Sequence, residues 1–141
     1  MRNVELIDRL FTLSNRCAIG DGTAMTELIA SYHGTADITA IMPLATAAQE
    51  STADLIRAYF DQVSRTCYVW YAYADELEER GDTVLALGGI RTVERETRED
   101  RETPVGWVFE VRGGKIAAAR AYSSHKDAMA AVRVGSAPPA A

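Results

Sequence analysis

The chain has 141 residues, of which 48% are hydrophobic and 25% charged, and its formal net charge at pH 7 is −5. A chain of this length fits one domain that buries about two-thirds of the surface its unfolded form exposes. The negative net charge, without any basic stripe, argues against a nucleic-acid partner. No apolar run approaches the ~18 residues that a membrane span needs, so we expect no membrane partner either.

The N-terminus and the cysteines indicate where the protein resides. Glu5 and Asp8 interrupt the apolar pattern of "MRNVELIDRLF", which therefore lacks the continuous hydrophobic stretch of a secretory signal. Cys17 and Cys67 lie far apart and have neither CxxC nor metal-type spacing, so we expect two reduced, buried thiols. From these observations we expect a cytoplasmic protein without a metal or a cofactor.

Helical periodicity dominates the first part of the chain. Apolar side chains at three- and four-residue spacing predict a helix over Asn3–Ala18, capped by its first residue. Thr23 is the predicted N-cap of a shorter second helix that ends at His33-Gly34. From Ala36 to Met42 apolar and polar residues alternate, which predicts a short strand closed by Pro43.

The rest of the chain has the composition of a β-sheet. After a loop at residues 44–52, Ser51 or Thr52 caps a third helix, and beyond Arg65 aromatic and β-branched residues become frequent. The segments "TCYVWYAYA", "TVLALGGIRTVERE" and "PVGWVFEV" predict three successive strands. The Gly113-Gly114 pair then predicts a hairpin to a last, alanine-rich strand.

Three helices followed by antiparallel strands describe an α+β fold, in which helices cover one face of a curved sheet. Residues 98–102, "REDRE", are expected at a solvated hairpin tip. After Tyr122 we expect one or two helical turns. The chain is thus predicted to form a single domain over residues 1–134, with a flexible C-terminal tail at residues 135–141.

The last strand carries unusually small side chains. Residues alternate between the two faces of a strand, so they fall into two sets. One face takes Ala117, Ala119, Ala121 and Ser123, and the other takes Ile116, Ala118, Arg120 and Tyr122. If the small set points inward, it leaves a cavity or lets a helix approach the sheet closely. The alternation also leaves undecided which residues around Gly88-Gly89 point inward, because a bulge there would reset it.

Four segments, in their order along the chain, resemble the nuclear transport factor 2-like (NTF2-like) superfamily, and within it the SnoaL-like polyketide cyclase and ketosteroid isomerase group. They are "LIASYH", "ADLIRAYF", "ERGDTVLALG" and "WVFEVRGGKIAAARAYSSHKDAMAAV", and the resemblance spans roughly residues 4–132. It implies a cone-shaped roll in which three N-terminal helices, packed on a curved and mostly antiparallel sheet, enclose a deep apolar pocket. It also implies a homodimer formed through the outer face of the sheet.

The resemblance further implies which side chains line the pocket. The expected ligand-binding residues are Ala40, Met42, Tyr59, Phe60, Trp107, Phe109, Ala119, Ala121 and Ser123. The catalytic residues of the group do not occur at the matching positions of this chain. By similarity the isomerase base falls on Ala40 and its second acid on Trp107, and the first helix has no tyrosine. No acidic residue lies between Glu110 and Asp127, where the cyclases place an aspartate.

His33, Tyr73 and His125 are the weak remaining candidates for proton transfer, because their side chains can exchange a proton. The sequence therefore indicates a SnoaL-like small-molecule pocket protein, an isomerase, cyclase or related proton-transfer enzyme acting on an apolar polycyclic or terpenoid-sized substrate. The alternative is a non-catalytic dimeric ligand-binding or accessory module. A third interpretation is a scaffold whose own aromatic side chains fill its interior. The sequence does not decide among them.

Overall fold

The structure of the protein, a computed structural model, describes residues 2–43 and 51–136. The described residues form four helices and a five-stranded sheet with strand order β1-β5-β4-β3-β2. The helices are α1 (Asn3–Ala18), α2 (Gly22–Ala30), α3 (Thr52–Thr66) and α4 (His125–Ser136). The strands are β1 (Tyr32–Asp37), β2 (Cys67–Arg80), β3 (Thr83–Glu94), β4 (Asp100–Arg112) and β5 (Lys115–Tyr122). The predicted α+β class is confirmed.

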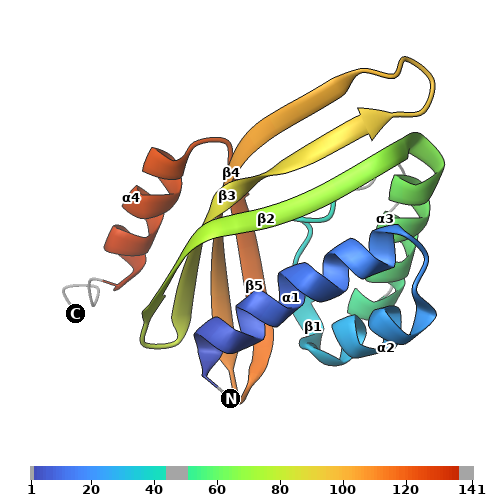
Figure 1. Cartoon of the computed structure of the whole chain (residues 1–141). Helices are drawn as coiled ribbons and strands as arrows, with labels where there is room; N and C mark the ends of the chain where they lie inside the picture. The colour runs from blue at the N-terminus through green and yellow to red at the C-terminus, as the bar shows by residue number, and fades with distance from the viewer. Residues whose placement is uncertain (1, 44–50, 137–141) are drawn as a thin grey trace.

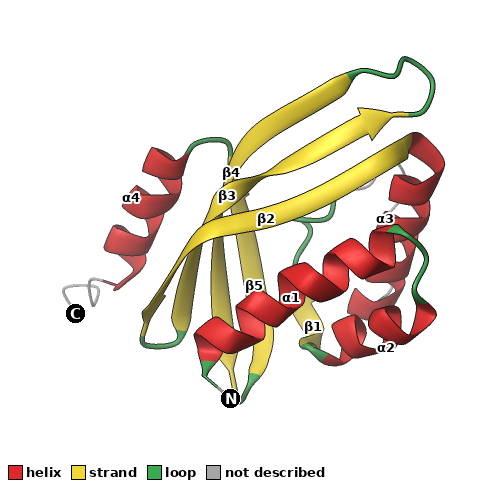
Figure 2. Ribbon diagram, viewed as in Figure 1, coloured by secondary structure: helices red, strands yellow, loops and turns green. Residues whose placement is uncertain are grey.

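Helices cover both faces of the sheet (Figures 1 and 2). α1, α2 and α3 lie over the face that carries the main hydrophobic core, and α4 packs on the opposite face against β3 and β4. β3 is therefore buried on both sides: Val84 and Ala86 face the main core, and Leu85 and Leu87 contact a smaller cluster under α4. The sequence predicted only a turn or two of this last helix, which has 12 residues.

The starts of the helices differ in how they are capped. α1 has the predicted bounds, but the predicted cap by Asn3 is wrong, because Arg2 is the N-cap and makes no side-chain capping hydrogen bond. At α2 the carboxylate of Asp21, rather than Thr23, accepts hydrogen bonds from two backbone N–H groups of the first turn, so it is the N-cap. Ser51 caps α3 by accepting a hydrogen bond from the Asp54 N–H at 3.1 Å. No helix in residues 2–43 and 51–136 is both long and apolar enough to cross a membrane.

The first strand lies earlier in the chain than predicted. The expected strand at residues 36–42 is wrong: β1 is Tyr32–Asp37, and it runs parallel to β5 with Tyr32 opposite Ile116. Residues after β1 instead form a turn in which the Ile41 and Met42 N–H groups donate to the Ile38 carbonyl. The alternation of apolar residues suggested a strand because Ile38 and Met42 are both buried, but they lie in this turn and not in a strand.

The last strand contains a bulge that the simple alternation missed. Val111 pairs with Ile116 but Glu110 pairs with Ala118, so Ala117 is the extra residue on β5. The bulge brings Ile116, which was predicted on the other face, into the main core beside Ala119. The Gly113-Gly114 hairpin is confirmed, and both glycines have positive φ as a two-residue turn of this kind requires.

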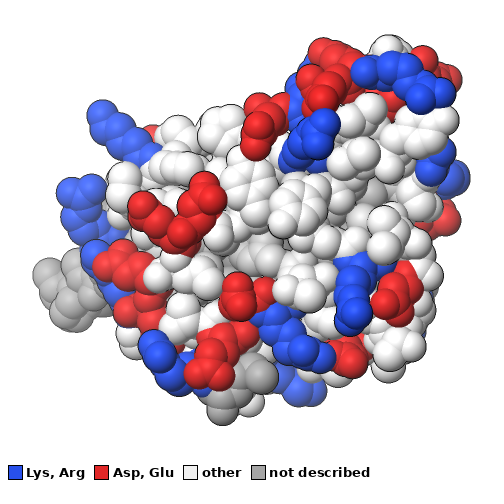
Figure 3. All heavy atoms as spheres, in the orientation of Figure 1, with Lys and Arg blue, Asp and Glu red and all other residues white. Residues whose placement is uncertain are grey.

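Charged residues gather at the far end of the β3–β4 hairpin (Figure 3). β4 begins at Asp100, so only part of the predicted tip at residues 98–102 lies in the turn. Arg91 pairs with Asp100 at 2.8 Å and Arg101 with Glu99 at 2.9 Å, on exposed side chains. Of the expected loop and tail, residues 44–50 and 137–141 lie outside the described residues, and residues 135 and 136 belong to α4.

Gly88 lies where two backbones approach closely. β2 has a bulge between Ala74 and Glu76, whereas β3 pairs with β4 without interruption, so the alternation along β3 is not reset. A Cβ at Gly88 would lie 1.8 Å from the Tyr73 carbonyl oxygen, which is closer than any real contact. Only glycine fits without moving one strand.

We predict that Gly88→Ala lowers the free energy of unfolding by at least about 1–3 kcal/mol, because the added methyl group must push β2 away from β3. Gly34→Ala is the matched control, since no heavy atom lies within 4 Å of a Cβ there. Urea denaturation followed by circular dichroism measures both variants. Equal midpoints for the two variants would contradict the close approach at Gly88.

Candidate functional site

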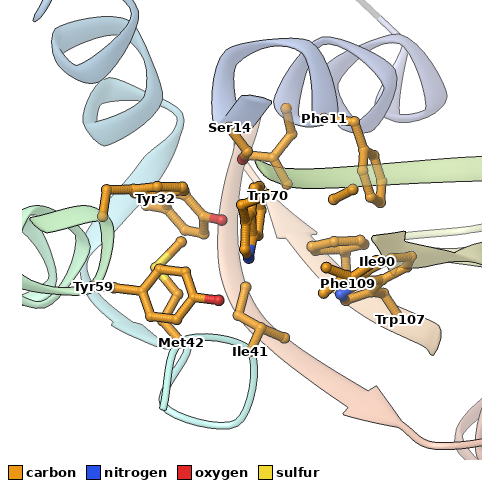
Figure 4. Close-up of a pocket in the computed structure, with 13 residues that line it drawn as sticks. Phe11, Ser14, Tyr32, Ile41, Met42, Tyr59, Trp70, Ile90, Trp107 and Phe109 are labelled. Atoms are coloured by element: carbon orange, nitrogen blue, oxygen red, sulfur yellow. The ribbon is translucent and has the colours of Figure 1, made fainter. Parts of the chain in front are cut away.

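A partly open hollow lies between the helices and the main face of the sheet (Figure 4). Its volume is about 40 Å³. We call it the aromatic pocket, and its lining residues are Leu10, Phe11, Ser14, Tyr32, Ile41, Met42, Tyr59, Phe60, Trp70, Ala72, Ile90, Trp107 and Phe109. They come from α1, β1 and the turn after it, α3, and strands β2 to β4. Segments far apart in the sequence therefore meet at one site.

Local periodicity points these side chains inward. Leu10 and Ser14 are four residues apart on α1, so they share the buried face of that helix. On β2, Trp70 and Ala72 are two residues apart and face the core, whereas Tyr71 lies between them and is 51% exposed. The predicted alternation of the aromatic residues on this strand is confirmed.

Ring-to-ring contacts form the frame of the pocket. Phe11 meets Trp107 edge-on with ring centroids 4.8 Å apart. On the other side, Trp70 contacts Phe60 at 5.5 Å and Tyr59 at 6.3 Å, again edge-on. Edge-to-face contacts of this kind are a favourable geometry for aromatic pairs. The walls of the pocket are therefore held in place by contacts between neighbouring rings.

A few neutral polar groups enter this apolar frame. The Tyr32 and Tyr59 hydroxyls and the Trp70 indole nitrogen point toward the same space in Figure 4. Burial raises the pKa of the Tyr32 hydroxyl well above its usual range, and Cys17 adds a smaller rise. Burial also raises the pKa of Tyr59, although a hydrogen bond with Trp70 lowers it in part. Both phenols are therefore protonated at neutral pH.

Five predicted ligand-binding residues line the aromatic pocket: Met42, Tyr59, Phe60, Trp107 and Phe109. The other four do not. Ala40 is exposed in the turn after β1, and Ser123 is exposed beyond the end of β5. Ala119 and Ala121 face the main core, but Phe109 lies opposite Ala119 and Trp107 opposite Ala121. The room that the two alanines leave is taken by these aromatic neighbours, so the cavity lies elsewhere.

None of the three proton-transfer candidates lines the aromatic pocket. His33 is on β1 and its Nε2 donates to the Arg112 carbonyl at 2.7 Å. His125 begins α4 on the opposite face of the sheet, and its Nε2 donates to the Gly88 carbonyl at 2.8 Å. The Tyr73 hydroxyl donates to a Glu102 carboxylate oxygen at 2.5 Å, which raises the pKa of Tyr73.

Sequence reasoning missed Tyr32 and Trp70 as lining residues. Tyr32 was placed on the second helix, although α2 ends at Ala30 and the residue opens β1. The alternation along the strand places Trp70 on the face opposite Tyr71 and Tyr73, but it does not by itself say which face points toward the helices. The alternation with Ala72 is the signal that could have found it.

Acid–base and metal chemistry have little support at this site. Among the described residues, none that lines the aromatic pocket is Asp, Glu, His, Lys or Arg. Across the described ranges, no three His, Cys, Asp or Glu side chains come together as a metal site would require. The arrangement can enclose an apolar molecule and offer it hydrogen bonds from neutral groups.

No protein-family model matches the chain, and no curated protein matches it significantly. Solved structures do resemble it. An NTF2-like protein of unknown function from Burkholderia pseudomallei superposes with a TM-score of 0.69 at 14% identity, covering 94% of this chain and 97% of that one. An NTF2-like protein from Burkholderia thailandensis also has a TM-score of 0.69, at 21% identity over 92% and 98% of the two chains.

A third similar structure is a hypothetical protein with a ketosteroid isomerase-like fold from Catenulispora acidiphila, in complex with trimethylamine. Its TM-score is 0.62 at 14% identity, covering 82% of this chain and 85% of that one. These likenesses show that the chain has the NTF2-like fold, as the sequence predicted. The narrower SnoaL-like assignment stays a prediction.

Next to Tyr32, the Cys17 thiol makes stability sensitive to alkaline pH. Cys17 is 3% exposed, and burial, with a smaller effect of Asp21, raises its pKa from 9.0 to about 11. A thiol in the unfolded chain ionises first as the pH rises. The resulting stability is complete below pH 9 and is lost as the pH approaches 11.

We predict that the free energy of unfolding falls between pH 9 and pH 11, and that Cys17→Ala removes about 1–2 kcal/mol of that fall. Cys67→Ala should leave the pH dependence as it is in the unmodified protein. The measurement is urea denaturation at a series of pH values. Identical slopes for the unmodified protein and Cys17→Ala would show that this thiol does not titrate abnormally.

Proposed function

We propose that the protein binds a compact, mostly apolar and uncharged small molecule in the aromatic pocket, as a non-catalytic member of its fold class. The observation that carries this proposal is the pocket itself, which is enclosed by aromatic and aliphatic side chains and contains only neutral polar groups. A charged ligand buried there would lose its hydration without meeting an opposite charge. An uncharged ligand would exchange water for ring contacts.

The size of the pocket supports a compact ligand over a polycyclic one. Its volume is about 40 Å³, whereas a cavity that binds benzene has about 150 Å³. A polycyclic or terpenoid-sized substrate, which the sequence suggested, would require α1 and α3 to move away from the sheet.

The lack of a suitable base supports binding over catalysis. General acid–base catalysis needs a group that is within hydrogen-bond reach of the ligand and titrates near the working pH. The phenols of Tyr32 and Tyr59 have raised pKa values and do not ionise near neutral pH. The proposal therefore follows the binding-module alternative rather than the isomerase or cyclase.

The homodimer and the cytoplasmic location expected from the sequence are part of this proposal. Tyr71 and Met129 are large apolar side chains that are 51% and 40% exposed, respectively. Covering them against a second copy would remove apolar surface from water, which supports self-association.

The chain carries its own reporters for a binding test, because its two tryptophans, Trp70 and Trp107, both line the aromatic pocket. We predict that a compact apolar compound shifts both indole N–H resonances in a ¹⁵N-labelled sample. Ser14→Leu should weaken binding about tenfold or more, because the larger side chain fills the pocket. Thr12→Leu, on the exposed side of the same helix, is the control.

Two outcomes would contradict the proposal. If a panel of compact uncharged compounds leaves both indole resonances unmoved at millimolar concentration, the pocket does not bind small molecules. Equal affinity in Ser14→Leu and in the unmodified protein would place the binding site elsewhere.

A further inference from the structure

The Tyr32 hydroxyl is a buried polar group without a partner. Tyr32 is 3% exposed, and its hydroxyl is the only fully buried side-chain nitrogen or oxygen in the described part of the chain that lacks a hydrogen bond. Leaving such a group unpaired destabilises a protein, so native structures rarely contain one. The orphan hydroxyl lies on the wall of the aromatic pocket and points into it (Figure 4). This geometry indicates a partner that arrives with the ligand.

The neighbours of Tyr32 determine what kind of partner fits. An indole N–H can donate a hydrogen bond but cannot accept one, and a protonated phenol also donates. The indoles of Trp70 and Trp107 line the pocket and only donate, whereas the hydroxyls of Tyr32, Tyr59 and Ser14 can donate or accept. An acceptor oxygen suits the unpartnered Tyr32 hydroxyl and an indole N–H alike.

We propose that the Tyr32 hydroxyl donates a hydrogen bond to the ligand, which is a compact, uncharged molecule with an acceptor oxygen. Small ketones, ethers and esters belong to this class. The assignment rests on the proposed function and makes Tyr32 the residue that selects the ligand by its polarity. The rings around it select the ligand by its size and shape.

Other ligand chemistries fit less well. A pure hydrocarbon has no acceptor and would leave the Tyr32 hydroxyl unpaired. An ammonium ion would face the indole N–H donors without a carboxylate, since no lining residue is acidic. A carboxylate would accept their hydrogen bonds, but no lining residue is basic, so its charge would stay uncompensated.

Acetone and 2-methylpropene test the role of the oxygen. The two molecules have the same shape, so any adjustment of the pocket needed to admit them is common to both. Because water hydrates acetone far more strongly than 2-methylpropene, the test compares the ratio of the two affinities between proteins. We expect Tyr32→Phe to lower the ratio of acetone affinity to 2-methylpropene affinity about tenfold, whereas Tyr71→Phe, which removes an exposed hydroxyl, should leave this ratio as it is in the unmodified protein. The shifts of the two indole N–H resonances give both affinities.

The stability of the ligand-free protein gives an independent readout. Tyr32→Phe removes an unpaired buried hydroxyl and leaves the ring, so the thermal midpoint should rise by a few degrees. Tyr71→Phe should leave it unchanged. A lower midpoint in Tyr32→Phe would mean that a water molecule already holds the hydroxyl, and it would overturn the inference.

The two probes also separate this inference from the proposed function. If the probes bind but Tyr32→Phe leaves the ratio of their affinities unchanged, the pocket binds ligands without selection by Tyr32, and the inference alone fails. If neither probe binds, the proposed function fails as well.

Discussion

The pairing of large rings with small residues across β4 and β5 fixes where free space remains in this protein. Phe109 lies opposite Ala119 and Trp107 opposite Ala121, so the aromatic side chains have room beside the alanine methyl groups. Phe11 then closes edge-on against Trp107 from α1. This part of the interior is filled by protein. The remaining hollow is displaced toward Tyr32, Tyr59 and Trp70, where rings meet edge-to-face and leave a gap between them.

The backbone holds Tyr32 at this gap. Tyr32 pairs with Ile116 at the start of the parallel β1–β5 ladder, and the Ile116 N–H donates to the Ser31 carbonyl at 2.9 Å. The β5 bulge fixes the register by turning Ile116 into the core. The tyrosine cannot turn its hydroxyl to solvent without breaking this ladder or unpacking its ring. An unpaired buried hydroxyl therefore persists because the surrounding structure determines its place.

The sequence was informative wherever one periodicity extended over many residues. The bounds of α1, the glycine turn between β4 and β5, and the placing of Trp70 on the face opposite Tyr71 and Tyr73 all follow from local pattern and turn chemistry. β1 could not be found this way, because its six residues are a strand only through pairing with β5, which is distant in sequence. The β5 bulge could not be predicted for the same reason. The true neighbours of Ala119 and Ala121 therefore could not be predicted either. Five of the nine predicted lining residues lie in the pocket because buried aromatic residues of a small domain converge on one core.

A fold that hosts proton chemistry in other proteins does not impose it, because function depends on the side chains at the site. In this chain the imidazoles that could move a proton donate to backbone carbonyls, His33 to Arg112 and His125 to Gly88, and so they help to hold strand and helix ends. The charged residues of the β3–β4 hairpin pair with one another on exposed side chains. What remains inside is a set of phenols and indoles with no charge at neutral pH. Such groups distinguish ligands by shape and by hydrogen-bond polarity, which is what binding requires. Proton transfer near neutral pH requires in addition a group that titrates there.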